Sequence, residues 1–251
     1  MRPCLLRIRL PWEAAIDITA LAQGKGLIMP NEQLPGIEQA FGVLRQFTRS
    51  RRSSSEPLER CELCSAGLAH EHPHLVELAT RTIVCACDPC ALLFDNAAIG
   101  KYKRVGRRAL RLADFEMTDA KWDGLLIPIN MAFFFRSSLE NRVVALYPSP
   151  AGAVESLLPM EAWQQIEESH GALMHLKPDI EALLVNRVGH AHGSAQAEYY
   201  VAPIDDCYRL VGVIRMHWKG LSGGAEVWTE IGRFFSDLRL RSEVIGEVPH
   251  A

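Results

Sequence analysis

The chain has 251 residues, of which 48% are hydrophobic and 23% charged, and its formal net charge is −3. This composition is that of a folded protein, and it excludes collagen, coiled coil or disorder for the bulk of the chain. The near-neutral balance argues against a general nucleic-acid binder, and without a run of about 18 apolar residues we expect no membrane span.

Residues 1–55 are expected to form an N-terminal arm, a short helix and a basic linker. The first 35 residues hold four prolines and show weak periodicity, whereas apolar spacing predicts a short helix from Gly36 to Arg45. The polar, basic run at 49–55 predicts a linker. Three arginines among the first ten residues interrupt any signal-peptide core, so we expect a cytoplasmic protein.

Residues 56–100 are predicted to form a cysteine-rich metal-binding module, and residues 101–251 an α+β domain. Apolar runs in that domain predict strands at 125–135, 143–147, 199–204 and 208–218. Residues 179–188 are compatible with a helix or a strand, and their β-branched end favours a strand. The last two strands are expected to pair antiparallel across a turn at Asp205 and Asp206. A helix is predicted from Pro159 to Gly171, and an amphipathic helix over 227–238 ends the domain. The predicted fold class is α+β: a small zinc-knuckle module followed by a mostly antiparallel sheet with flanking helices.

The most informative pattern is a set of five cysteines within 30 residues. Cys61 and Cys64 form one Cys-x-x-Cys pair, and Cys87 and Cys90 form a second. Two such pairs can place four thiolates around one metal ion, because each turn folds back on itself. The pattern predicts a tetrahedral sulfur site for zinc, and iron remains an alternative because a single iron takes the same ligands.

Cys85 exceeds the four ligand positions of such a site. In an extended segment it would share a face with Cys87, so it is expected near the metal. It is interpreted as an alternate ligand, a hydrogen-bonding neighbour or a spare reactive thiol.

Three histidines, His70, His72 and His74, lie between the two cysteine pairs. His72 and His74 are weaker candidates for metal ligands, either beside the zinc or in a second metal site. His70 to His74 also fits the H-E-x-x-H pattern of metalloproteases, but that pattern works on a helix and Pro73 disfavours one.

Other candidate sites are weaker. Asp205, Asp206 and Cys207 suit a catalytic turn, although a hairpin turn with a buried cysteine is commoner. The six cations between Lys101 and Arg111 are expected to be a solvated face. We find no Ser/His/Asp or Cys/His constellation, so the catalytic residues are unknown.

Several segments together resemble an uncharacterised bacterial family, a domain of unknown function whose genes often lie beside those of uptake nickel–iron hydrogenases. The resemblance covers about 36–242. The segments that carry it are Cys61–Cys64, His72–Val76, Cys85–Phe94, Trp122–Leu125, Leu146–Gly152, Asp179–Arg187, Pro203–Gly212 and Trp218–Gly224.

The resemblance implies an accessory or assembly factor of a nickel–iron hydrogenase. In this interpretation the chain is a metal-containing binding module, and its partner is a hydrogenase subunit or a maturation protein. The first alternative is a rubredoxin-like redox protein with iron in the cysteine site. The second is a metal-dependent enzyme of unknown substrate that uses the histidines or the turn at Asp205–Cys207.

Overall fold

The computed structural model describes residues 59–95, 100–189 and 196–246. The expected arm, short helix and linker of residues 1–55 lie outside the described residues. From Glu59 onward the described chain belongs to one compact unit.

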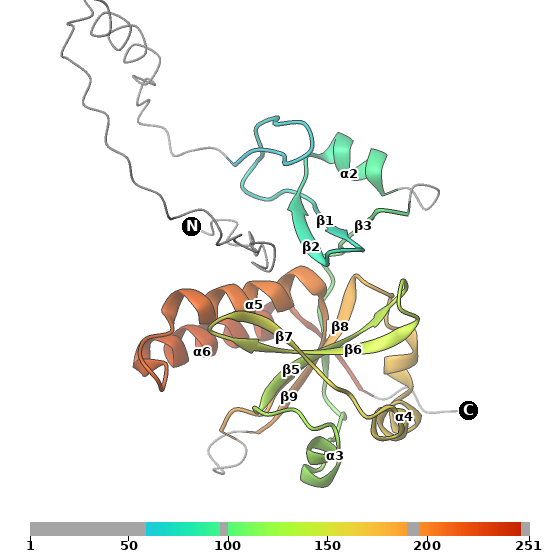
Figure 1. The fold of residues 1–251 in the computed structure, drawn as a ribbon, viewed down its shortest axis with the longest axis vertical. Coiled ribbons are helices and arrows are strands. Elements are labelled where there is room, and N and C mark those ends of the chain that lie inside the picture. The colour runs from blue at the N-terminus through green and yellow to red at the C-terminus, as the bar shows by residue number, and fades with distance from the viewer. Residues whose placement is uncertain (1–58, 96–99, 190–195, 247–251) are drawn as a thin grey trace, which may run out of the picture. The chain divides into compact units, whose positions relative to one another are not determined.

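The cysteine-rich segment is built on a small three-stranded sheet of order β2-β1-β3 and one helix (Figure 1). Its elements are β1 (His74–Glu77), β2 (Thr82–Cys85), α2 (Asp88–Phe94) and β3 (Tyr102–Arg104). Ile83 and Val84 lie in β2, and α2 begins two residues before Cys90. Pro89 lies in the first turn of α2, where its missing N–H is no loss.

The small sheet is buried on both faces. Leu75 and Val84 are cross-strand partners that pack against the buried cysteines Cys61 and Cys90. Val76 and Ile83, the next partners along, pack instead into the main core beneath α5. Because alternate side chains of β1 and β2 point to opposite faces, the small sheet joins the cysteine cluster to the main core.

The second sheet has seven strands in the order β10-β4-β9-β8-β5-β6-β7. All its pairs are antiparallel except β10 with β4, which confirms the predicted mostly antiparallel sheet. Its strands are β4 (Leu110–Leu112), β5 (Met131–Ser137), β6 (Arg142–Ser149), β7 (Gly152–Ser156), β8 (Glu181–Asn186), β9 (Glu198–Pro203) and β10 (Glu243–Ile245).

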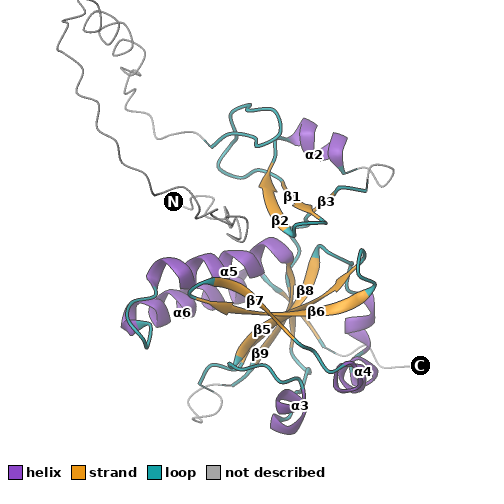
Figure 2. Ribbon diagram, viewed as in Figure 1, coloured by secondary structure: helices purple, strands orange, loops and turns teal. Residues whose placement is uncertain are grey.

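Helices cover both faces of this sheet, as Figure 2 shows. Helices α5 (Ile204–His217) and α6 (Gly224–Arg241) lie on one face. The other face carries α3 (Asp119–Gly124), α4 (Met160–Ser169) and the 3-10 helix η1 (Gly171–His175). The flanking helices expected from the sequence are therefore present, and the predicted last helix is confirmed as α6.

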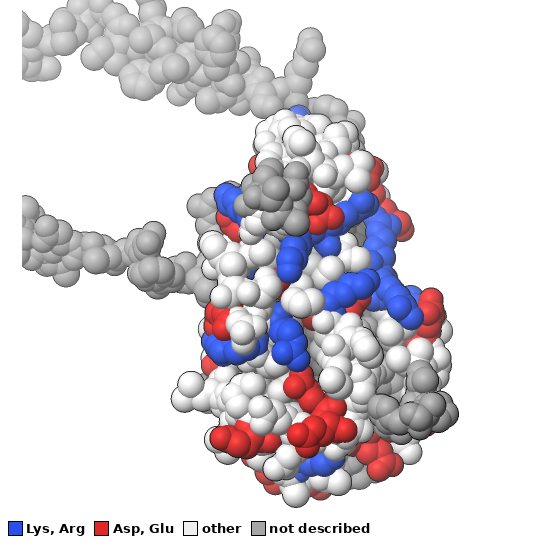
Figure 3. All heavy atoms as spheres, turned by 90° about the vertical axis from the view of Figure 1, so that its right-hand side faces the viewer, with Lys and Arg blue, Asp and Glu red and all other residues white. Residues whose placement is uncertain are grey.

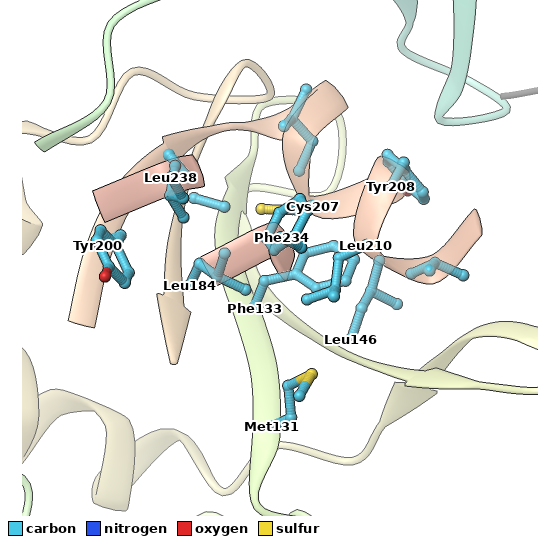
Figure 4. Close-up of a cluster of buried hydrophobic side chains, with 14 of the residues drawn as sticks. Met131, Phe133, Leu146, Leu184, Tyr200, Cys207, Tyr208, Leu210, Phe234 and Leu238 are labelled. Atoms are coloured by element: carbon cyan, nitrogen blue, oxygen red, sulfur yellow. The ribbon is translucent and has the colours of Figure 1, made fainter. Parts of the chain in front are cut away.

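The central strand β5 explains this layering. Residues Met131 to Phe135 are all buried, because alternate side chains point to opposite faces and each face carries helices. Phe133 packs under α5 and α6, with its ring centroid 5.7 Å from that of Tyr208 (Figure 4). Phe134 packs on the opposite face and stacks on Trp163 of α4 at 5.0 Å.

Two of the predicted strands are corrected by the structure. Residues 208–218, predicted as a strand, form most of helix α5, which follows β9 directly. The apolar run predicted a strand, but buried residues of α5 recur at helical spacing. Among these residues are Ile204, Cys207, Tyr208, Val211 and Ile214.

The second correction concerns residues 125–135, of which only Met131 onward is strand. The preceding residues follow α3 as an irregular segment in which Leu126 has a positive φ of 55°. The strands predicted at 143–147, 179–188 and 199–204 are confirmed as β6, β8 and β9, and the predicted helix near 160–170 is confirmed as α4.

An ion-pair network joins the turn between β1 and β2 to the edge of the large sheet. Arg81 donates to Glu155 at 2.8 Å and also pairs with Glu140, and Arg142 contacts both carboxylates. Partial burial would raise the pKa of Glu155, but hydrogen bonds and charge from Arg142 and Arg81 outweigh it and lower that pKa.

We expect Glu155→Gln to weaken this connection modestly. A carboxyl whose pKa is lowered by folding stabilises the protein above its ordinary pKa and loses that contribution as the pH falls. The variant should therefore unfold more easily by up to about 1 kcal/mol near pH 7, since the group is partly solvent-screened. It should also lose less stability than the native chain on acidification below about pH 4.5, which urea unfolding at several pH values will measure. An unchanged acid profile would contradict the assignment.

Candidate metal centre

The first half of the cysteine centre is a tight turn from Cys61 to Cys64. The Ser65 amide donates to the Cys61 carbonyl at 2.7 Å, and the Cys61 amide donates to the Ala66 carbonyl at 2.8 Å. Ser65 takes a left-handed conformation with φ of 63°, which lets the chain reverse within one turn. The reversal brings the sulfur atoms of Cys61 and Cys64 to the same side.

The second half forms where strand β2 changes into helix α2. The strand ends at Cys85, and Cys87 is the extended residue that precedes the helix. The Ala91 amide donates to the Cys87 carbonyl at 2.8 Å, which closes the first helical turn. Cys87 and Cys90 therefore lie one turn apart on one side of α2.

Two hydrogen bonds hold the two halves together. The Glu62 amide donates to the Cys85 carbonyl at 2.9 Å, and the Cys85 amide donates to Glu62 Oε1 at 3.0 Å. The first turn is thus fixed against the end of β2 by a backbone bond and a side-chain bond.

The four sulfur atoms of Cys61, Cys64, Cys87 and Cys90 all lie within 4.8 Å of one another. Those of Cys64 and Cys87 are 3.6 Å apart. A tetrahedron with metal–sulfur bonds of about 2.3 Å has sulfur–sulfur edges of about 3.8 Å, so the spacing fits one ion. All four side chains are free thiols. These residues could hold a metal ion, and four sulfur ligands would leave no open position for a substrate.

The environment of the thiols matches a cation site. Burial would raise the pKa of Cys61, but amide hydrogen bonds from Cys87, Cys64 and Leu63 outweigh it and lower the pKa to about 6. Desolvation and hydrogen bonds with the neighbouring cysteines raise the pKa of Cys90 to about 12. One thiolate forms readily, whereas a second thiolate beside it is disfavoured by repulsion between like charges. A bound cation would relieve this repulsion.

Cys85 does not join this group. Because β2 ends at Cys85 and the Ala86 amide turns back to donate to the Pro73 carbonyl at 3.0 Å, the extended geometry expected to align Cys85 with Cys87 stops between them. Cys85 instead lies opposite His74, its partner across the β1–β2 pair. His72, His74 and Cys85 form a second group of potential ligand atoms within 4.8 Å of one another.

A cleft of about 800 Å³ opens where the cysteine-rich segment meets the large sheet. His70, His72, His74 and Asp205 line it together. Its lining also includes five cationic side chains, those of Arg104, Arg107, Lys177, Arg209 and Arg241. On the face shown in Figure 3, Lys and Arg side chains gather in the upper and middle part of the described surface, and Asp and Glu are prominent below.

The cleft contains a contact that sequence reasoning missed. His74 Nδ1 lies 2.6 Å from Asp205 Oδ2, although 131 residues separate the two in the sequence. Both residues were candidates separately, but no local pattern could indicate that they meet. The supposed hairpin turn at Asp205 is instead the first turn of α5, and this is what points Asp205 toward β1.

The neighbours of Asp205 have other roles. Asp206 is buried and pairs with Arg209 at 3.0 Å and with Arg241. Burial, followed by the charge of Asp205, raises the pKa of Asp206 although these two cations lie beside it. Cys207 is fully buried in the core beneath α5 (Figure 4), and its burial raises the pKa of the thiol well above the ordinary value. A thiol of this kind packs as a small apolar group and is not placed for catalysis.

Several cations of the basic stretch at 101–111 form ion pairs. Lys103 lies 2.5 Å from the buried Asp179, Lys101 pairs with Glu77 at 3.2 Å, and Arg107 pairs with Glu71 at 2.9 Å. His70, an exposed residue outside any helix, precedes β1, so the H-E-x-x-H geometry does not form. His190 and His192 lie outside the described residues.

Comparison with models of known protein families matches residues 60–242 to DUF5947, a family of unknown function. No curated protein and no solved structure matches the chain significantly. Within the described residues, no helix has both the length and the apolar character needed to cross a membrane.

Proposed function

The chain belongs to the DUF5947 family, whose function is unknown, and we propose that it is an accessory or assembly factor of a nickel–iron hydrogenase. It would act as a metal-containing binding module whose partner is a hydrogenase subunit or a maturation protein. The metal part is supported by the four converging sulfur atoms. The hydrogenase part is supported by the resemblance to a family encoded beside hydrogenase genes.

Zinc is the metal we propose for the four-cysteine site. Four thiolates saturate a tetrahedral zinc ion, and a closed zinc site of this kind contributes directly to folding. The proposed cytoplasmic location agrees with it, since a reducing compartment keeps cysteines as thiols or metal ligands.

An apolar surface beside the metal site suits contact with a partner. Leu92 and Leu93 of α2 are 68% and 64% exposed, and they follow Cys90 and Ala91 in the same helix. Adjacent exposed leucines on a small rigid module are typical of protein contacts. We propose that this surface of α2 binds the hydrogenase component.

Affinity capture of the full chain from cells that produce the hydrogenase tests this proposal. We expect the native chain to recover a hydrogenase subunit or a maturation protein. Leu92→Asp/Leu93→Asp should lower the recovery about tenfold or more, since each lost apolar contact is worth roughly 1–2 kcal/mol. Leu157→Asp, at a residue that is 92% exposed and outside the module, is the matched control and should recover the partner normally. Recovery of no hydrogenase component by the native chain would contradict the proposal.

One observation favours a second candidate, a rubredoxin-like redox protein with iron in the same site. Cys64 is exposed and Cys87 is half-buried, so one edge of the sulfur cluster reaches the surface. Electron transfer to a partner benefits from such an edge. A red protein with thiolate-to-iron absorption bands would support this candidate, and a colourless zinc protein would eliminate it.

A further inference from the structure

We propose that an apolar pocket between the large sheet and helices α5 and α6 binds a small, uncharged and largely aromatic molecule. The pocket shares no residue with the four-cysteine site, and the proposed binding of a partner through α2 does not require it. Its volume, its lining and the fixed position of one wall point to such a ligand.

The floor of the pocket is the margin of the main core. Met131 of β5, Ile214 of α5 and Ile231 of α6 are buried core residues that also line the pocket. Figure 4 shows Met131 at the margin of the buried cluster, apart from the other labelled side chains. The pocket has a volume of about 600 Å³. This value falls in the range of about 300–1,000 Å³ that is typical of small-molecule sites.

Two tryptophans form walls of the pocket. Trp218 ends α5, and Trp228 lies in the second turn of α6, where it is 46% exposed. The indole faces of these residues offer broad flat surfaces on which an aromatic ring can pack. An indole that is half exposed beside a concave apolar surface gains contact area when a ligand covers it.

The loop after α5 holds Trp218 in place. The indole Nε1 of Trp218 donates to the Gly220 carbonyl at 2.9 Å, so the polar atom of the ring is already satisfied. Gly223 has a φ of 86°, and a Cβ atom added there would lie 3.1 Å from ring carbons of Trp218. The loop is closed by the Lys219 amide, which donates to the Gly223 carbonyl at 3.0 Å. This wall is thus formed before a ligand arrives, which lowers the entropic cost of binding.

The lining determines the chemistry of the ligand. None of the described residues that line the pocket is charged, although 23% of the chain is charged. A charged ligand would lose its hydration there without gaining a partner, so an uncharged ligand is favoured. The Asn130 amide and the Ser149 hydroxyl also line the pocket and can orient one polar group. An extended peptide would bring many backbone N–H and C=O groups into this mostly apolar lining, which favours a compact small molecule.

Titration of the full chain with N-phenylnaphthylamine, an uncharged aromatic dye that fluoresces in apolar surroundings, tests the proposal. We expect saturable binding of one dye molecule per chain. Anilinonaphthalene sulfonate, a dye of similar size that carries a negative charge, should bind at least about tenfold more weakly because the lining offers it no cation.

Variants of Trp228 locate the bound dye. Trp228→Asp places a carboxylate in the apolar lining and should weaken binding of the uncharged dye at least about tenfold, whereas Trp228→Phe keeps an aromatic wall and should stay within about threefold of the native affinity. Leu240→Asp, on the same helix but outside the pocket and 86% exposed, is the matched control and should bind as the native chain does.

Three results would overturn the proposal. The first is a native chain that binds no uncharged dye saturably, and the second is equal binding by the native chain and Trp228→Asp. The third is a native chain that leaves the dye unbound but loses its captured protein partner on Trp228→Asp substitution, since this result would assign the pocket to a protein contact.

Discussion

A chain that carries Cys61→Ser and Cys90→Ser should lose the metal of the four-cysteine site, and the segment around it should unfold. Both residues are buried within the small core of the module. Serine replaces neither thiolate as a ligand, and structural zinc binding is worth about 10–16 kcal/mol in small zinc domains. The core around the four cysteines is small, so we expect the ion to supply much of the stability of this segment.

Hydrogen exchange together with metal analysis will measure this effect. The amides of Ser65 and Ala91 close the two cysteine turns and the amide of Cys85 joins the halves, so all three should lose protection in the variant. Cys207→Ala is the matched control: it removes a buried thiol from the main core, so it should lower stability and leave the metal content unchanged. Full protection of these amides in the double serine variant would show that the site does not depend on a metal.

The second large effect is expected at the central strand. Phe133→Ala and Phe134→Ala should each lower the free energy of unfolding by about 3–5 kcal/mol, because each removes a fully buried ring and leaves a cavity. The two residues are adjacent in sequence but pack on opposite faces of β5, in different cores. Comparable losses are therefore expected only if helices cover both faces of the sheet.

Urea unfolding of the purified variants will measure both losses. Leu157→Ala is the control at a side chain that is 92% exposed, and it should change the free energy of unfolding by less than about 0.5 kcal/mol. A loss below about 1 kcal/mol at either phenylalanine would contradict the layered arrangement.

Local patterns explain what the sequence could predict. The helical period in 227–238 predicted α6, and the apolar runs predicted β6, β8 and β9. The Cys-x-x-Cys spacing predicted two turns that each present a pair of cysteines. This was possible because each turn is closed within a few residues by its own hydrogen bonds. These features need no information from distant parts of the chain.

The incorrect and missing predictions have different causes. In α5 the helical spacing from Ile204 to Ile214 was present, but the apolar run and the turn propensity of Asp205 and Asp206 favoured a hairpin. The acidic pair in fact occupies the first turn of a helix, where negative charge is stabilising. Periodicity should have outweighed propensity in this segment.

The placement of Cys85 and the contact between His74 and Asp205 depend on tertiary structure. The prediction that Cys85 and Cys87 share a face required the strand to continue to Cys87. In the structure the strand ends at Cys85. The contact between His74 and Asp205 joins the first strand of the module to the start of α5. Only the packing of the small sheet against the main core creates it.

Metal analysis and a visible spectrum of the full chain, purified without added metal, test the central claim most directly. The account predicts a metal ion that co-purifies with the native chain and is absent from Cys61→Ser/Cys90→Ser, with a colourless spectrum if the ion is zinc. A native chain that folds without metal and whose four thiols all react at once with an alkylating reagent would contradict it.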